Sequence, residues 1–245
     1  MLILLPPSEG KTAPARGRPL DLAALSHPEL GPTRERVLAA LVAVCSGPPE
    51  PALAALGLSP GQAGELALNA RLAGARTAPA ARIYSGVLYE RLRLHELPKR
   101  ARDRVLIASA LWGMVRPDDR IPAYRLGIGA RLPRLGPLAA LWRPALRAAL
   151  PDGGLVVDLR SGGYAAAWTP RDAAVVGVRA FTERGGRRTA VSHMVKATRG
   201  DVARLLLEAS PPPRRPDRVA EIVAASGREV EFTGSSVDVI EKLRP

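Results

Sequence analysis

The sequence of 245 residues lacks several features that define well-known classes of protein. It has one cysteine, Cys45, so an intrachain disulfide is excluded, and the helical apolar pattern around Cys45 predicts a buried structural thiol. No apolar run approaches the roughly 18 residues that a membrane-spanning helix needs, so no membrane partner is expected. The N-terminus has no basic region before its short apolar stretch, so no signal peptide is predicted. Together these absences predict a cytoplasmic protein.

Metal-binding patterns and the usual catalytic motifs are also missing. His27 and His95 lie in polar surroundings with no partner at metal-ligand spacing, so neither a metal nor a cofactor is predicted. No nucleophile elbow, zinc-protease motif or C-x-x-C pair occurs. Gly10-Lys11-Thr12 resembles the end of a P-loop, but Leu5 stands where that motif needs its first glycine. The two prolines that follow Leu5 lack the N–H groups that cradle a phosphate, which argues against a P-loop.

Positive charge is what the sequence has in excess. There are 36 Lys and Arg residues against 23 Asp and Glu residues, which gives a formal net charge of +13. A GC-rich coding sequence explains why 32 of the 36 basic residues are Arg, but it does not explain their excess over the acids. Such an excess favours polyanionic partners, nucleic acid first, because Lys and Arg contacts to phosphate release counterions.

Short apolar runs bounded by turn residues alternate with helical patterns along the chain. We predict strands at Leu2–Leu5, Val105–Ala110, Leu155–Leu159 and Ala174–Val178, with weaker strand patterns at Thr189–His193 and Glu229–Phe232. We predict helices at Thr33–Val44, from Ser59 to about Leu72, and at Gly136–Leu150, Val195–Ala209 and Pro216–Ala225. The alternation predicts a mixed α/β (α+β) fold, one domain over residues 1–245, with a central sheet flanked by helices.

The most informative segment is Leu111–Leu132, which directly follows the predicted strand Val105–Ala110 and is shaped by prolines and glycines. Loops on a rigid scaffold carry function, so arginines placed in one are candidates for binding an anion. The alternative is that the arginines of this segment only form ion pairs within the loop, with Asp118 and Asp119, and bind no ligand. The segment carries three candidate binding residues, Arg116, Tyr124 and Arg125, and two arginines that we expect to be surface charge, Arg120 and Arg131.

Three other segments place polar side chains at strand ends or helix starts. Ser8 and Lys11 follow the first strand, and a glycine-rich turn with Ser161 and Tyr164 follows the strand Leu155–Leu159. The third segment is the start of the predicted helix Val195–Ala209, where Lys196 and Arg199 are three residues apart and share a face. Cations near a helix start oppose the helix dipole, which favours a bound anion between them. The predicted anion- or DNA-binding residues are Ser8, Lys11, Arg116, Tyr124, Arg125, Ser161, Tyr164, Lys196 and Arg199, and Lys11, Lys196 and Ser161 are the candidate catalytic residues.

Five pieces of sequence occur in order across nearly the whole chain: LILLPPSEGKT, Tyr84-Ser85-Gly86, SALWGMVRPDDRIPAYRLGIGARL, VVDLRSGGYAAAW and HMVKATRGDVARLLL. With these pieces the chain resembles the peroxide stress protein YaaA family. The resemblance implies a cytoplasmic, single-domain mixed α/β protein with a basic cleft. It also implies binding to single- and double-stranded DNA, a helix-hairpin-helix element, and protection of DNA and iron balance under hydrogen peroxide stress. The segment Leu58–Ala78 is where we place the helix-hairpin-helix.

Two motifs depart from the family pattern. The N-terminal motif, Pro7 to Thr12, is one residue longer than the S-P-A-K-T of better-known members and carries Glu9. The turn after the strand Leu155–Leu159 keeps the serine and tyrosine of N-L-A-S-x-E-Y but lacks its glutamate. If that glutamate is a general base in the family, this protein uses another, for which Glu9 and Asp158 are the candidates.

Two functions follow from these residues. The first is a cytoplasmic DNA-binding protein of the peroxide stress response, holding phosphates with little sequence specificity. The second is an enzyme acting on a small anionic or nucleotide-like substrate, with Lys11 or Lys196 as base or nucleophile and Arg116 and Arg125 clamping the anion. A narrow pocket favours the enzyme, whereas an open groove as wide as a duplex favours DNA.

Overall fold

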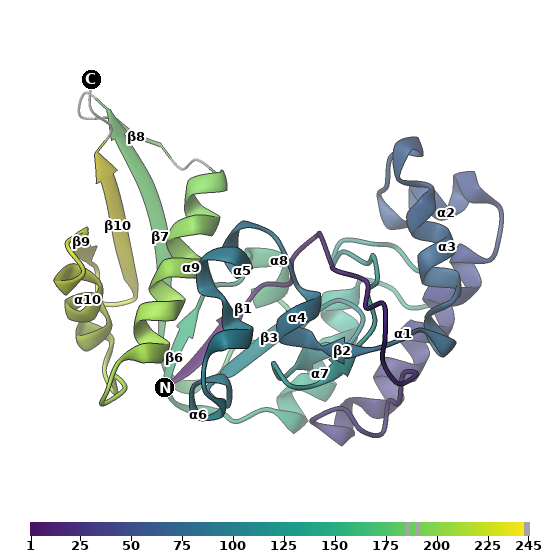
Figure 1. The fold of residues 1–245 in the computed structure, drawn as a ribbon, viewed down its shortest axis with the longest axis horizontal. Coiled ribbons are helices and arrows are strands. Elements are labelled where there is room, and N and C mark those ends of the chain that lie inside the picture. The colour runs from purple at the N-terminus through teal and green to yellow at the C-terminus, as the bar shows by residue number, and fades with distance from the viewer. Residues whose placement is uncertain (185–186, 190–191, 243–245) are drawn as a thin grey trace.

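A mostly parallel sheet forms the centre of the computed structural model, which describes residues 1–184, 187–189 and 192–242 (Figure 1). The strand order is β4-β3-β1-β6-β7-β10-β9, and β8 pairs with β7. Strands β3, β1, β6, β7 and β10 run parallel, whereas β4, β8 and β9 pair antiparallel with their neighbours. The strands are β1 (Leu2–Leu5), β3 (Val105–Ser109), β4 (Gly113–Val115), β6 (Gly153–Asp158), β7 (Asp172–Arg184), β8 (Arg187–Thr189), β9 (Glu229–Phe232) and β10 (Ser236–Lys242). A separate antiparallel pair joins β2 (Ala78–Pro79) to β5 (Arg120–Ile121).

Helices pack around this sheet and form a lobe at one end of the molecule. The lobe contains α1 (Gly31–Cys45), α2 (Pro49–Leu56) and α3 (Gly64–Ala70), drawn in blue in Figure 1. Helix α9 (Ser192–Glu208) packs on β7 and on the short helix α5 (Val87–Leu92). The remaining helices are α4 (Ala80–Ile83), α6 (Lys99–Arg102), α7 (Leu138–Ala149), α8 (Gly162–Ala165) and α10 (Pro216–Ala225). In the described ranges, no helix combines the length and the apolar character that crossing a membrane requires.

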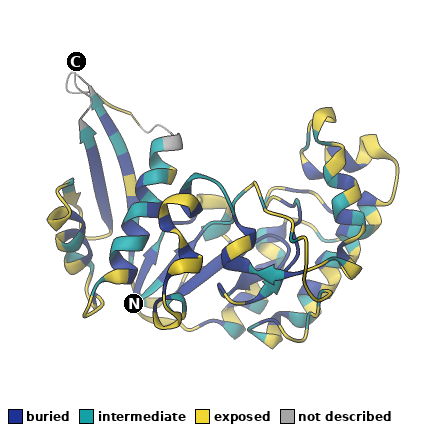
Figure 2. Cartoon of the chain, in the orientation of Figure 1, coloured by how far each residue is buried: buried dark blue, intermediate teal, exposed yellow. Residues whose placement is uncertain are grey.

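The inner strands are buried on both faces. Every residue of β3 is buried, and so are Ile3, Leu4 and Leu5 of β1 (Figure 2). Continuous apolar runs of this kind are typical of parallel strands with elements packed on both sides. The sequence pattern predicted these two strands because neither run contains a charged residue and Ser109 is the one polar residue in them.

The order of the strands decides where a ligand site can form. From β1 the chain crosses to β3 on one side, and it later returns to β6 on the other side of β1. The direction in which strands are added therefore reverses between β1 and β6. In open α/β sheets, ligands bind at the carboxyl ends of the strands at such a reversal. The segments that follow β1 and β6 begin at that edge.

The predicted fold class is confirmed, and several elements have the predicted bounds. Strands β1 and β9 and helix α10 begin and end at the predicted residues. The strand prediction over Thr189–His193 is wrong at its end, because α9 begins at Ser192; residues 190–191 lie outside the described ranges. The sequence analysis did not predict α2, α5 or β10.

The segment that was predicted as one helix from Ser59 to about Leu72 is divided into three short pieces. The Ser59 N–H donates to Gln62 Oε1 at 3.1 Å and closes a 3₁₀ turn at Pro60–Gln62, after which α3 follows as a separate helix. A second 3₁₀ turn occupies Leu72–Gly74, and the chain is then extended. One α-helix between two single turns is not the pair of helices around a hairpin that was placed at Leu58–Ala78, so that placement is not shown.

Candidate functional site

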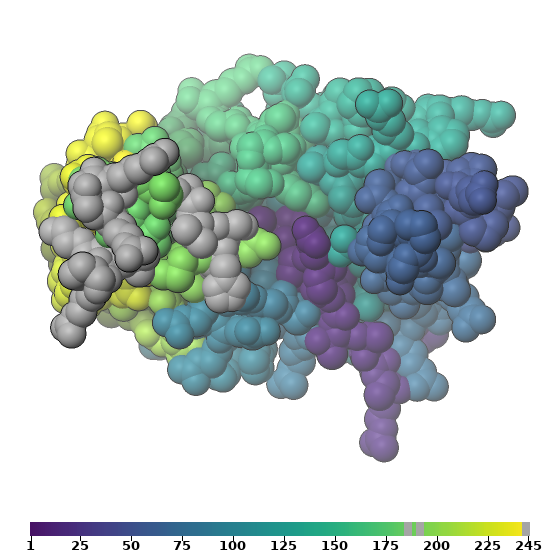
Figure 3. Space-filling model, turned by 90° about the horizontal axis from the view of Figure 1, so that it is seen from above, coloured from purple at the N-terminus to yellow at the C-terminus, as the bar shows by residue number. Residues whose placement is uncertain are grey.

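A cavity of about 600 Å³ lies at the carboxyl ends of β1 and β6. Its walls come from the segment after β1, the turn that leads into α8, the start of α5, the loop at residues 125–128, the α2–α3 connection and α9. In Figure 3 the purple N-terminal segment lies between the blue α1–α3 lobe and green α9. The volume is within the range of roughly 300–1,000 Å³ that small-molecule sites occupy.

The fold brings seven of the nine predicted binding residues to this cavity. They are Ser8, Lys11, Arg125, Ser161, Tyr164, Lys196 and Arg199. These residues come from four segments that are distant in sequence, and the parallel sheet gathers three of them by placing the ends of β1 and β6 beside α9. The roles assigned to these side chains remain predictions.

Arg116 does not line the cavity, so the fold does not bring it together with the other predicted binding residues. Strand β4 runs antiparallel to β3 and carries the chain back toward the amino end of β3, away from the ligand edge. There the Arg116 guanidinium donates to the Asp103 carbonyl at 3.0 Å, and the Arg116 N–H donates to the Asp119 carboxylate at 2.8 Å. Arg116 therefore holds the β4–β5 loop through hydrogen bonds, and the ion pair expected between its side chain and Asp118 or Asp119 does not form; Asp118 pairs with Arg102 instead.

Two further arginines of this segment were predicted to be surface charge. Arg131 is exposed, as expected. Arg120 is half-buried, and its guanidinium donates to the Thr77 carbonyl at 2.7 Å, so it ties β5 to the chain before β2 instead of standing free in solvent.

Lys11 is the most unusual residue of the cavity. Its half-buried ammonium donates to the carbonyls of Ser8 at 2.8 Å and Glu9 at 3.4 Å, and it lies 4.3 Å from the centre of the Tyr124 ring. The ring face favours the charged form. Burial and the nearby Arg125 guanidinium outweigh that contact and lower the pKa of Lys11 from 10.5 to about 7.

Tyr124 is the second predicted binding residue that does not line the cavity. It lies behind Lys11. Its hydroxyl is 2.9 Å from the Tyr84 hydroxyl and 2.7 Å from Ser109 Oγ, which in turn accepts the N–H of Trp112 at 2.9 Å. Burial raises the pKa of Tyr84 and of Tyr124, so both phenols stay protonated. The network fixes the aromatic floor beneath Lys11.

Arg125 is positioned by a side chain that the sequence analysis missed. Asn69 of α3 is fully buried; its amide donates to the Arg125 carbonyl at 2.7 Å and its oxygen accepts the Arg125 N–H at 2.9 Å. The Arg125 guanidinium lies 3.4 Å from the Glu9 carboxylate, which is 81% exposed. A ligand anion can replace that exposed carboxylate. A polar residue on the apolar face of a helix was the signal that could have identified Asn69.

The turn after β6 contains a buried ion pair. Both carboxylate oxygens of Asp158 accept hydrogen bonds from the Arg160 guanidinium. Nε donates to Oδ1 at 2.9 Å, and Nη2 donates to Oδ2 at 2.7 Å. Asp158 is therefore held by Arg160, whereas Glu9, the other candidate base, lines the cavity. Ser161 is exposed at the wall, and burial raises the pKa of Tyr164, which keeps its hydroxyl protonated.

Helix α9 supplies the other cations. Lys196 is exposed, whereas Arg199 is half-buried and donates from Nε to the Val178 carbonyl at 3.1 Å. Burial lowers the pKa of Arg199, although its guanidinium stays charged at neutral pH. The cavity thus has cations from the segment after β1, from the loop at Arg125 and from α9.

Apolar side chains complete the cavity, and sequence reasoning missed them. The side chains that form this wall are Leu56, Leu58, Val87, Leu88, Leu126 and Ile128. They come from the α2–α3 connection, α5 and the loop after Arg125. No motif marks them, because their neighbourhood is set by how the lobe and α5 close over the sheet edge. A site with cations and an apolar wall suits a ligand that has both an anionic group and a flat or apolar body.

The comparison with known proteins agrees with the resemblance in sequence. A family model described as peroxide stress protein YaaA matches residues 1–225. The chain belongs to this family. A UPF0246 protein of Streptomyces coelicolor is 46% identical over 241 residues, covering 94% of this chain and 92% of the relative. UPF0246 proteins of Corynebacterium glutamicum and Corynebacterium efficiens are each 40% identical over 236 and 237 residues, covering 94% and 95% of this chain and 95% of each relative.

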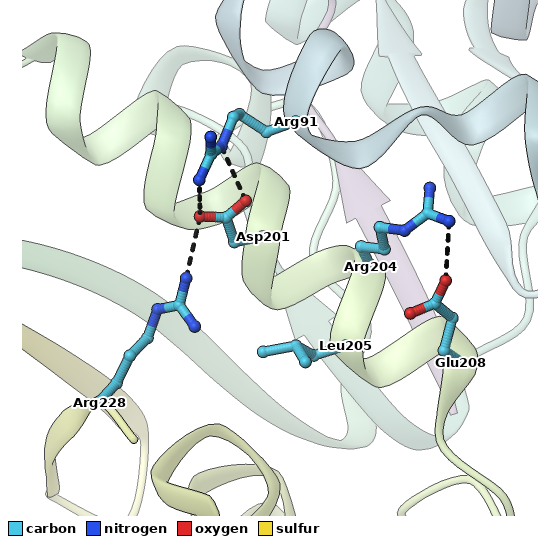
Figure 4. A pocket seen from close by; sticks show the side chains of 6 residues that line it. All are labelled: Arg91, Asp201, Arg204, Leu205, Glu208 and Arg228. Carbon is cyan, nitrogen blue, oxygen red and sulfur yellow. Dashed lines mark hydrogen bonds and ion pairs between the residues drawn. The ribbon is translucent and has the colours of Figure 1, made fainter. Parts of the chain in front are cut away.

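A second hollow on this YaaA-family protein is an ion-pair cluster (Figure 4). Arg91 holds both oxygens of Asp201 at 2.9 Å, Arg228 contacts the same carboxylate at 2.9 Å, and Arg204 pairs with Glu208 at 2.8 Å. All three of its arginines are thus paired with Asp201 or Glu208. In the part of the chain that the structure describes, no group of three or more His, Cys, Asp or Glu residues could hold a metal ion.

Proposed function

We propose that this YaaA-family protein acts in the cytoplasm during peroxide stress by binding a small anionic, nucleotide-like ligand in the cavity at the ends of β1 and β6. The observation that carries the proposal is the convergence of Lys11, Arg125, Lys196 and Arg199 on one cavity of about 600 Å³. Family membership supports the role in peroxide stress.

The two kinds of wall suit the two parts of such a ligand. Arg125 offers a planar guanidinium whose two N–H edges can bind a phosphate or carboxylate bidentately. The apolar wall of Leu56, Leu126 and Ile128 can cover a base or another flat ring. Cations from three segments of the cavity wall also favour a ligand with more than one anionic oxygen.

Replacing Arg125 with glutamine is expected to weaken nucleotide binding by roughly 10- to 100-fold, since a hydrogen bond to a charged group contributes about 1.5–3 kcal/mol. Isothermal titration of AMP and ADP into the wild-type chain and into Arg125→Gln measures the effect. Arg131→Gln is the matched control, because Arg131 is exposed and does not line the cavity. Absence of binding by the wild type, or an equal loss in the control, would sink the proposal.

A second candidate function, DNA binding through a basic cleft, is supported by the net charge of +13. Double- and single-stranded oligonucleotides are expected to bind with little sequence preference, and the affinity is expected to fall at least about a thousandfold between 50 and 200 mM salt. Fluorescence anisotropy across that salt range measures this. Binding that is undetectable at low salt, or insensitive to salt, contradicts DNA binding. A saturating concentration of ADP then tests whether DNA occupies the nucleotide cavity. ADP displaces DNA that enters the cavity and leaves DNA bound elsewhere on the surface in place.

A further inference from the structure

Lysine is rare in this chain, and it is concentrated at the cavity. The four lysines are Lys11, Lys99, Lys196 and Lys242, and two of them, Lys11 and Lys196, line the same cavity. Arginine, which fills the other 32 basic positions, binds anions at least as well but cannot act as a nucleophile. A primary amine among guanidiniums is thus chemically distinct from its neighbours.

We propose that Lys11 is a nucleophile that forms an imine with an aldehyde carrying a phosphate or carboxylate group. This inference rests on the proposed function, since the same cavity must first bind the anionic group, and it narrows the ligand to a carbonyl compound.

Within the part of the chain that the structure describes, the Lys11 nitrogen lies at the cavity without a carboxylate partner. Among the ion pairs of the described residues, none includes Lys11, although Glu9 lies two positions away. Its partners are the carbonyl oxygens of Ser8 and Glu9 and the face of the Tyr124 ring. Lys99, by contrast, is exposed and paired with the Asp103 carboxylate at 2.8 Å.

Burial and neighbouring charge act in the same direction. The Arg125 guanidinium and the desolvated setting lower the pKa of Lys11 to about 7, despite the opposing carboxylates of Glu65 and Glu9. About half of the Lys11 side chains are then unprotonated at neutral pH, whereas an ordinary lysine is almost wholly charged. Arg125 thus has two roles, since it can hold the ligand's anion and it disfavours the ammonium.

The reaction balances without an oxidant or reductant. The lone pair of Lys11 Nζ forms a bond to the carbonyl carbon, and a proton leaves the nitrogen while the carbonyl oxygen gains one. The C–O bond of this carbinolamine then breaks, water leaves, and the C=N bond of the imine remains. Tyr164 lines the same cavity with its hydroxyl protonated, so it can supply the proton that the departing oxygen needs, and its phenolate regains a proton when the nitrogen loses its second one.

The test uses pyridoxal 5′-phosphate as a probe that carries an aldehyde and a phosphate, with glyoxylate as the carboxylate counterpart. Borohydride traps any imine as a stable secondary amine, and peptide mass spectrometry reports which of the four lysines is labelled. We expect Lys11 to be labelled at least tenfold faster than Lys99. The variant Lys11→Arg keeps the cation and removes the amine, so it should lose that label; Lys99→Arg is the matched control.

The controls separate this inference from the proposed function. Pyridoxine 5′-phosphate has the same ring and phosphate but no aldehyde, so its binding, measured by calorimetry, tests the anion site alone. If it binds while Lys11 is labelled no faster than Lys99, the nucleophile assignment is overturned and the anion site stands. If it does not bind and Lys11 is not labelled, both fail. Selective labelling of Lys11 that free pyridoxine 5′-phosphate suppresses supports both.

Discussion

A chain in which leucine replaces Arg160 is expected to lose about 3–5 kcal/mol of unfolding free energy, the cost of leaving a buried charge without its partner. The Arg160 side chain is fully buried and that of Asp158 is 14% exposed, and their two hydrogen bonds, at 2.9 and 2.7 Å, account for both carboxylate oxygens. Without the guanidinium, the Asp158 carboxylate loses its paired cation and keeps the backbone N–H of residue 160, 3.0 Å from its Oδ1. Urea denaturation measures the loss.

The double variant Asp158→Asn, Arg160→Leu is the control for this prediction. It removes the buried charge together with its partner, so it should recover a large part of the lost stability. A loss below about 1 kcal/mol for Arg160→Leu, the range of exposed pairs, would show that this pair is solvated. The pair directly precedes Ser161, so its loss is also expected to displace that wall of the cavity.

Gly200→Ala is expected to destabilise the protein by about 1–3 kcal/mol, which is typical of overpacking. Gly200 lies in the middle of α9, where alanine would ordinarily stabilise a helix by about 1 kcal/mol. A Cβ atom at Gly200 would stand 2.8 Å from Arg91 Cβ and closer still to the Leu88 carbonyl oxygen, so α9 and α5 would have to separate. Thermal denaturation should show a lowered melting temperature.

The matched control is Gly64→Ala in α3. Gly64 also lies in a helix, but nothing stands within 4 Å of the position its Cβ would take, so alanine there should be neutral or stabilising. If Gly200→Ala and Gly64→Ala change the stability in the same direction, glycine at position 200 is not required for the close packing of α5 on α9. Leu88 of α5 and Lys196 and Arg199 of α9 all line the cavity, so Gly200→Ala is also expected to weaken nucleotide binding.

Arg160→Leu and Gly200→Ala both act on the scaffold that holds the site. The cavity residues that bear charge stand on short segments after strands or on the first turns of α9, and each segment is fixed by a buried contact behind it. Asn69 does this for Arg125, Tyr124 for Lys11, and Arg160 for the turn with Ser161. Such support is what keeps a binding site in its working geometry.

Local pattern in the sequence was sufficient for the inner strands β1, β3, β6 and β7, although not for β10, and for most long helices. The apolar runs at Leu2–Leu5 and Val105–Ala110 have one stable environment, between layers, so their place as inner strands follows from composition alone. The segment around Ser59–Leu72 was harder, because glycines and a capping serine allow either one helix or several turns, and packing of the lobe decided the outcome.

The sequence by itself determined the fold class, the family and the polar segments after β1 and β6 and at the start of α9, because strand ends and helix starts are local features; it did not identify the apolar walls from the α2–α3 connection and α5. Only the tertiary structure decided which side chains share the cavity. The antiparallel turn into β4 directs Arg116 away from it, and the aromatic packing places Tyr124 beneath Lys11. The distinctive chemistry of Lys11 belongs to the fold as well, since burial and the charge of Arg125, which is 114 positions away, act on its pKa through space.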